Sequence, residues 1–127
     1  MNTNEFLKKF YRQTLVGKGT EYESTIQDLR PMAVCADGFQ ISIQASQCHY
    51  CSPRRDGCID YKEVELGFPS LAEEMIRDYA EDDDLTRTVY GYVPVELVDR
   101  MLQKHGGIAG YRKAGEEPEE PVWFDKN

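Results

Sequence analysis

The segment 39–58, FQISIQASQCHYCSPRRDGC, contains three of the four cysteines and could bind a metal. Cys48 and Cys51 have the spacing of a zinc-binding pair, and Cys58 follows shortly after them. Cys35 lies on the preceding predicted strand, so four sulfurs could converge on one structural Zn²⁺. The second closely spaced pair of most four-cysteine sites is missing, however. The alternative is that Cys35 is a core residue and the other three are free thiols of a loop.

A nucleophilic thiol is a second hypothesis, with Cys51 as the nucleophile and His49 or His105 as its base. Such catalysis requires a lowered thiol pKa and a third group that orients the base. Arg54 and Arg55 would favour a thiolate, but the sequence contains no nucleophile elbow and no protease signature. A zinc- or thiol-dependent enzyme therefore stays an alternative, and we assign no catalytic residue.

The same loop carries groups that bind anions. Its hydroxyl, imidazole and guanidinium groups are those that hold phosphate, and two tyrosines of a later strand could provide stacking faces. The predicted ligand-binding residues are His49, Tyr50, Ser52, Arg54, Arg55, Tyr90 and Tyr92. The sequence has no glycine-rich phosphate loop, because its one glycine pair follows a predicted helix instead of preceding one. The alternative is a solvated loop with ordinary surface arginines.

Negative charge is concentrated in the second half of the chain. Residues 1–60 contain seven basic and seven acidic side chains, whereas residues 61–127 contain eight basic and sixteen acidic ones, which accounts for the net charge of −8. This balance disfavours direct nucleic-acid binding, which needs a Lys/Arg surface, and favours a basic protein partner. The residues predicted to contact that partner are Asp82, Asp83, Asp84, Glu116, Glu117, Glu119, Glu120 and Trp123. Solubility alone could also explain these charges.

Hydrophobic patterns predict the elements that position these groups. Helical spacing of apolar residues predicts helices over 4–13, over 70–80, where Ser70 and Glu73 form a capping box, and from Pro94 to the glycine pair at 106–107. Strands are predicted at 32–36, 39–45, 61–68 and 88–93. Asp37-Gly38 indicates a hairpin with a type I′ turn, and alternation places Tyr90 and Tyr92 on one face of their strand. Residues 20–30 are ambiguous between an edge strand and a helical turn.

Together these elements predict one α+β domain, with an antiparallel sheet of about four strands and two to three helices packed on it. Residues 1–19 are expected to form an N-terminal helix, 20–108 the core domain, and 109–127 an acidic tail outside it. No apolar run approaches the ~20 residues of a membrane span, and the N-terminus lacks the pattern of a secretion signal. We therefore expect no membrane span and folding in a reducing cytosol.

Four blocks of sequence resemble a family of small proteins encoded by tailed bacteriophages and prophages. The blocks are SIQASQCHYCSPR, YKEVELGFPS, YAEDDD and TVYGYVPVELVDRMLQKHGGI, which together cover roughly residues 32–108. The family has no established activity, so the resemblance implies a phage origin and the cytoplasm of a bacterial host. Its pattern includes Cys51 within HYCSPR but not Cys48 or Cys58.

These observations support two leading hypotheses. The first is a phage accessory protein that inhibits a host or anti-phage defence component, such as a CRISPR-type nuclease complex, by placing its acidic surface against a basic partner. The second is a protein that captures a nucleotide-like ligand. Homo-oligomerisation stays open in both.

Overall fold

The computed structural model describes residues 1–114 and 119–124, and a central hairpin organises them. Its strands are β3 (Met32–Cys35) and β4 (Gln40–Gln44), which pair antiparallel as predicted. The turn is not type I′, because Gly38 has a positive φ of 94° and Asp37 does not. Gly38 N donates to Cys35 O and Cys35 N donates to Phe39 O, so the loop has three residues with glycine in the left-handed position.

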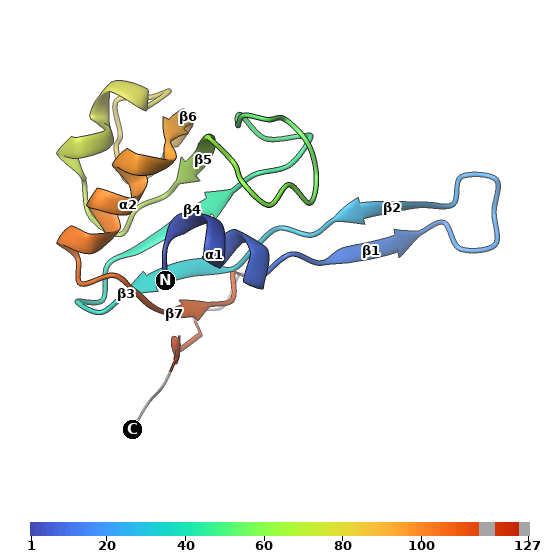
Figure 1. Ribbon diagram of the computed structural model, residues 1–127, viewed down its shortest axis with the longest axis horizontal. Coiled ribbons are helices and arrows are strands. Elements are labelled where there is room, and N and C mark those ends of the chain that lie inside the picture. The colour runs from blue at the N-terminus through green and yellow to red at the C-terminus, as the bar shows by residue number, and fades with distance from the viewer. Residues whose placement is uncertain (115–118, 125–127) are drawn as a thin grey trace.

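The hairpin lies in the middle of a six-stranded antiparallel sheet with the order β6-β5-β4-β3-β7-β8 (Figure 1). The outer strands are β5 (Glu63–Gly67), β6 (Val89–Pro94), β7 (Ile108–Arg112) and β8 (Val122–Trp123). A separate two-stranded sheet and three helical segments complete the α+β domain. The fold class is confirmed, and the main sheet has two more strands than the four expected.

One face of this sheet is buried against the helices. On β4, Ile41 and Ile43 are fully buried, whereas Ser42 points to the opposite, open face, so the predicted alternation is confirmed. Helix α1 (Thr3–Lys9) contributes Phe6 and Leu7 to the same core, and α2 (Val95–Lys104) contributes Val98, Met101 and Leu102. The core therefore lies between the sheet and these two helices.

The helices differ from prediction at their ends. Helix α1 begins at a capping box of Asn2 and Glu5 and ends at Lys9, short of the predicted residue 13. The second segment, η1 (Glu74–Tyr79), is a 3₁₀ helix that begins with Glu73 as its N-cap. Ser70 is not the cap, because its hydroxyl accepts a hydrogen bond from Gln40 N instead.

Strands β1 (Gln13–Val16) and β2 (Ser24–Gln27) form a two-stranded arm that extends from the body of the molecule (Figure 1). The predicted helix end at residue 13 is wrong, because Gln13 begins β1. For residues 20–30, which were ambiguous between an edge strand and a helical turn, the strand is confirmed at Ser24–Gln27. The exposed apolar side chains Leu15, Tyr22 and Ile26 show that it has no core of its own.

The chain continues in the sheet beyond residue 108, where the sequence analysis placed a tail. Strand β7 pairs with β3, and Val122 and Trp123 of β8 pair with β7. Gly110 makes this pairing possible, because a Cβ there would lie 2.4 Å from Val122 O. None of the helices in the described ranges has the length and apolar character required to cross a bilayer.

Candidate functional site

The loop from Ala45 to Tyr61 is held by the protein's own hydrogen bonds. Asn4 exchanges two of them with the backbone of Tyr61, and Gln27 donates to Ala45 O and accepts from Gly57 N. The Tyr61 hydroxyl donates to Arg55 O at 2.5 Å, and Ser52 forms a bridge with Glu63. Side chains from α1 and β2 therefore fix this loop without a bound metal ion.

The four cysteines do not converge. Cys35 is buried in β3, Cys48 is exposed, and Cys51 is buried with its thiol directed at Ser46 O, 3.2 Å away. Within the described ranges, no three His, Cys, Asp or Glu side chains are arranged to hold a metal ion. The predicted convergence of Cys35, Cys48, Cys51 and Cys58 is therefore wrong, because strand β3 directs Cys35 into the core.

Cys51 also lacks the surroundings of a nucleophile. Burial raises the pKa of its thiol more than the neighbouring arginine charges lower it. His49 Nδ1 contacts the Ser46 hydroxyl at 2.6 Å, and both ring nitrogens of His105 contact carboxylates. Neither imidazole ring is hydrogen-bonded to the Cys51 thiol, whose contacts are with Ser46 O and Pro53 O.

The predicted anion-binding residues separate into two places. His49 borders a groove of about 300 Å³ on the open face of the sheet, beside Gln44 and Glu65. Burial lowers the pKa of His49, which favours its neutral form. Tyr50 and Tyr92 instead line a shallow depression of about 250 Å³ together with Tyr79, Glu81 and Gly91.

The depression is an exposed aromatic surface. Tyr50 is 41% exposed and Tyr92 43%, with ring centroids 5.9 Å apart. The Arg54 guanidinium lies 5.5 Å from the centroid of the Tyr50 ring, so three of the predicted residues do meet. Gly91 allows this packing, because a Cβ there would lie only 3.2 Å from the Tyr50 Cβ. Arg55, by contrast, is an exposed loop residue.

Tyr90 is not available to a ligand. It is fully buried, and its hydroxyl donates to Leu85 O. Opposite the single residue Glu65, β6 has two residues, Gly91 and Tyr92, and Tyr92 adopts a φ of 55°. This β-bulge interrupts the alternation, so Tyr90 faces the core and Tyr92 faces solvent. The prediction that the two rings share one face is therefore wrong.

The predicted acidic residues 82–84 follow directly after Glu81 at the edge of the aromatic depression. All three are exposed, and Asp84 lies 3.9 Å from exposed Arg87. Asp82 and Asp83 form no ion pair with any cation in the described part of the chain. We call the side chains of Tyr50, Tyr79, Tyr92 and residues 81–84 the tyrosine–acid face.

The remaining predicted contact residues are distributed elsewhere. Glu119 and Glu120 are exposed, and Trp123 is half-buried in β8. Glu116 and Glu117 lie outside the described residues. The face thus contains three of the predicted acids, and Glu119 and Glu120 lie shortly before β8.

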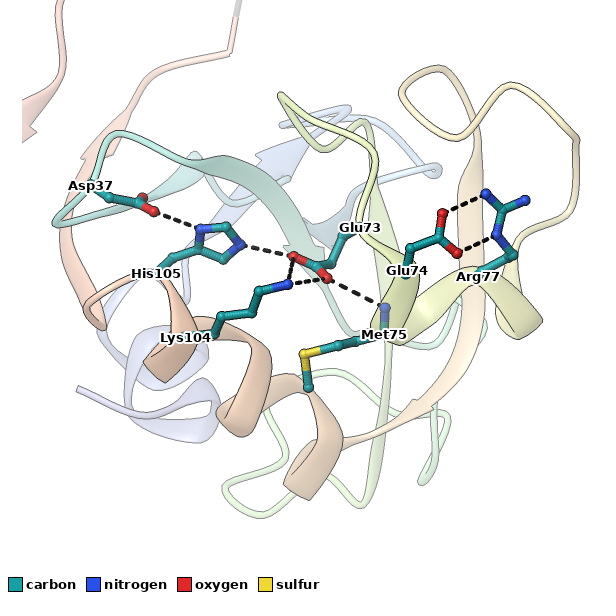
Figure 2. A network of polar contacts seen from close by, with 7 residues as sticks. All are labelled: Asp37, Glu73, Glu74, Met75, Arg77, Lys104 and His105. Atoms are coloured by element: carbon teal, nitrogen blue, oxygen red, sulfur yellow. Dashed lines mark hydrogen bonds and ion pairs between the residues drawn. The ribbon is translucent and has the colours of Figure 1, made fainter.

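Sequence reasoning missed one cluster of charged side chains, which Figure 2 shows between the β3–β4 turn, η1 and the end of α2. Glu73 is buried and accepts from Lys104 Nζ at 2.9 Å and from His105 Nε2 at 2.9 Å. His105 Nδ1 lies 2.7 Å from Asp37 Oδ2, and its ring stacks on Phe39 at 4.0 Å. We call Asp37, Glu73, Lys104 and His105 the Glu73 charge cluster; Glu73 is its buried centre, whereas Asp37 and Lys104 reach it from exposed positions. The cluster joins residues far apart in the sequence, so no local pattern indicates it.

The contacts of the cluster fix its charges. Burial opposes protonation of His105, but the hydrogen bonds to Glu73 and Asp37 outweigh it and raise the pKa of His105. Burial likewise opposes ionisation of Glu73, and hydrogen bonds from His105 and Lys104 nevertheless lower the pKa of Glu73. The imidazolium therefore donates from both nitrogens to two carboxylates.

Comparisons of the chain with models of protein families, with curated proteins and with solved structures found no match.

Proposed function

We propose that this protein is a phage accessory factor that inhibits a host or anti-phage defence component by binding a basic surface of it through the tyrosine–acid face. The observation that carries the proposal is the position of two half-exposed tyrosines beside Glu81, which is followed by Asp82 and Asp83, two exposed acids that pair with no cation in the described part of the chain. The resemblance to phage proteins supports the setting of the proposal, the cytoplasm of a bacterial host.

The chemistry of the face suits arginine and lysine side chains. Tyrosine rings attract cations over their faces, and carboxylates accept charge-assisted hydrogen bonds from guanidinium groups. Tyrosine also provides large contact area at a low cost in conformational entropy, which is why it is frequent among the residues that dominate interface energies. The depression between the rings offers a place for one such side chain.

The acids near the tyrosine rings would increase the rate at which a basic partner associates and the selectivity for that partner. Unpaired carboxylates at the edge of an interface steer a basic partner and make its association sensitive to salt. Arg54, which covers part of the Tyr50 ring, becomes the group that an incoming guanidinium must displace or stack beside.

The test begins with capture of partners from infected and uninfected bacterial lysate, followed by calorimetry with the purified partner. Reversal of charge in Asp82→Lys/Asp83→Lys should weaken binding by at least about tenfold at low salt. The matched control is Glu21→Lys/Glu96→Lys, which makes the same change in net charge at exposed positions outside the face. Equal effects of the two double variants would contradict the proposal.

A second pair of variants tests the aromatic part. Tyr92→Ala should weaken binding by about 2 kcal/mol if the ring is an anchor. Tyr22→Ala is the control, because Tyr22 is 78% exposed on the distant arm. Inhibition of the partner's activity, lost together with binding in Tyr92→Ala, would separate an inhibitor from a passive ligand.

A further inference from the structure

Arg30 carries a buried positive charge that is hydrogen-bonded to backbone carbonyls and to none of the carboxylates that the structure describes. Its side chain is only 3% exposed, and it donates from Nε to Leu7 O at 2.9 Å and from Nη1 to Ala45 O at 2.8 Å. It forms no ion pair with any Asp or Glu in the ranges that the structure describes. A buried guanidinium stays protonated, so its charge calls for a counter-ion.

A cavity of about 320 Å³ adjoins this charge, between α1 and the loop after Arg54. Lys8 lines it as a second cation without an ion-pair partner among the described side chains, and Tyr11 contributes a hydroxyl that donates to none of them. Gly57 lies against that hydroxyl, since a Cβ there would be 3.1 Å from Tyr11 Oη. None of the described residues that line the cavity carries a carboxylate.

The remaining walls are apolar or soft. Leu7 is buried at the base, Ile59 is 76% exposed at the edge, and Cys58 presents a thiol. The cavity thus joins two cations and a hydroxyl to a wall that suits carbon. In a protein with a net charge of −8, such a locally positive hollow stands out against the overall field.

We propose that this cavity binds a small molecule that carries a phosphate group, with Arg30, Lys8 and Tyr11 as the groups that hold the phosphate. Phosphate offers several acceptor oxygens to these donors, and its charge would balance both cations. The volume lies at the lower end of small-molecule sites, which suits a simple phosphate monoester. The bound anion would supply the counter-charge that Arg30 lacks.

The other hollow beside Arg30 fits this ligand less well. The groove on the open sheet face also contains Arg30, but it includes the carboxylate of Glu65 and no second Lys or Arg. His49, its other basic group, has a pKa lowered by burial and is neutral near pH 7. We therefore assign the phosphate to the cavity beside α1.

The test uses inorganic phosphate and phenyl phosphate as probes, with sodium chloride at matched ionic strength and benzoate as a carboxylate control. Both phosphate probes should raise the melting temperature of the protein, as ligands that bind only the native state do. Benzoate should produce a smaller rise. An equal rise with benzoate, or none with either phosphate probe, would overturn the proposal.

Variants locate the site. Lys8→Gln should weaken phenyl phosphate binding about tenfold and Tyr11→Phe about threefold, because each removes one hydrogen bond to a charged group. Lys18→Gln is the matched control, since Lys18 is exposed on the arm and loses the same charge. Arg30 itself is left intact, because its hydrogen bonds to Leu7 O and Ala45 O also support the fold. Unchanged binding in Lys8→Gln would contradict the assignment.

A second readout uses the cysteines already present. Cys58 lines the cavity, whereas Cys48 is exposed and lies outside it. Phenyl phosphate should slow the alkylation of Cys58 by iodoacetamide several-fold and leave the rate at Cys48 unchanged, with both rates read by peptide mass spectrometry. Protection of neither thiol, or of both equally, would place the ligand elsewhere and overturn the proposal.

Discussion

The protein uses carboxylates in two opposite ways within a short stretch of chain. Glu73 is buried and bound by an ammonium and an imidazolium, whereas Asp82 and Asp83 are exposed and pair with no cation among the described residues. A count of formal charge treats these acids alike. The comparison teaches that only the partners of a carboxylate decide whether its charge supports the fold or is left for another molecule.

The largest effect is expected when the buried carboxylate of this comparison is removed. Glu73→Ala should lower the free energy of unfolding by about 3 kcal/mol, because it leaves His105 and Lys104 without their shared counter-charge. Its neighbour supplies the control: Glu74 pairs with Arg77 at the exposed surface, so Glu74→Ala should lower the free energy of unfolding far less than Glu73→Ala does. Urea denaturation measures both. Equal losses would mean that the Glu73 charge cluster contributes no more than a surface pair.

A smaller effect depends on pH. Because the pKa of His105 is raised above 6.5, its stabilising contribution is complete below about pH 6.5 and is lost as the pH rises through the folded-state value. At pH 6, His105→Gln should therefore lower the free energy of unfolding by about 1.5 kcal/mol. The difference in stability between the variant and the wild type should become smaller at higher pH. Denaturation midpoints of the two proteins at pH 6, 7, 8 and 9 test this.

The comparison of variant with wild type is needed because other groups titrate as well. His49 has a lowered pKa, so its contribution is present above about pH 6.5 and is lost as the pH falls, which is the opposite slope. The carboxylates of Glu73 and Asp37, with lowered pKa values, lose their contributions only as the pH falls below their ordinary values of 4.5 and 3.8. A difference in stability between wild type and His105→Gln that stays constant from pH 6 to 9 would contradict the protonated state of His105.

The smallest effect on stability is expected when the charges of the exposed acids are removed. Asp82→Asn/Asp83→Asn should change the free energy of unfolding by less than about 0.5 kcal/mol, because neither acid forms an ion pair with a described residue. Asparagine also keeps the hydrogen bond from Asp83 N to the side chain at position 82. Thermal melts at two salt concentrations test this. A loss above about 1 kcal/mol would assign these acids to the fold.

Much of the fold could be predicted from local patterns. The hairpin of β3 and β4, strands β5 and β6 and helix α2 follow from alternation, helical spacing and turn residues. The ends of the elements could not be predicted, because tertiary contacts decide them. Ser70 is a residue type that often caps helices, but its hydroxyl accepts a hydrogen bond from Gln40 N of β4. Glu73 caps η1 instead and also contacts His105.

The candidate site could be predicted only in part. Tyr50, Arg54 and Tyr92 were expected together and do meet, whereas Tyr90 was assigned to the wrong face because one inserted residue in β6 shifts the alternation. A glycine within a strand, such as Gly91, is often found at a β-bulge, but the hydrophobic pattern of this strand does not locate the inserted residue. Arg30 could not be identified either. Its burial depends on Leu7 O and Ala45 O, which the fold alone brings together.

The two-stranded arm of β1 and β2 gives the molecule a part that can be altered without rebuilding the rest. Its outer loop around Lys18 and Gly19 is exposed, and its side chains contribute nothing to the hydrophobic core. Exposed loop tips of this kind tolerate insertions best, because lengthening an exposed loop costs little conformational entropy. A peptide label or a small reporter domain grafted at this tip would leave both proposed binding surfaces unchanged, which makes the arm the natural handle for immobilising or visualising the protein.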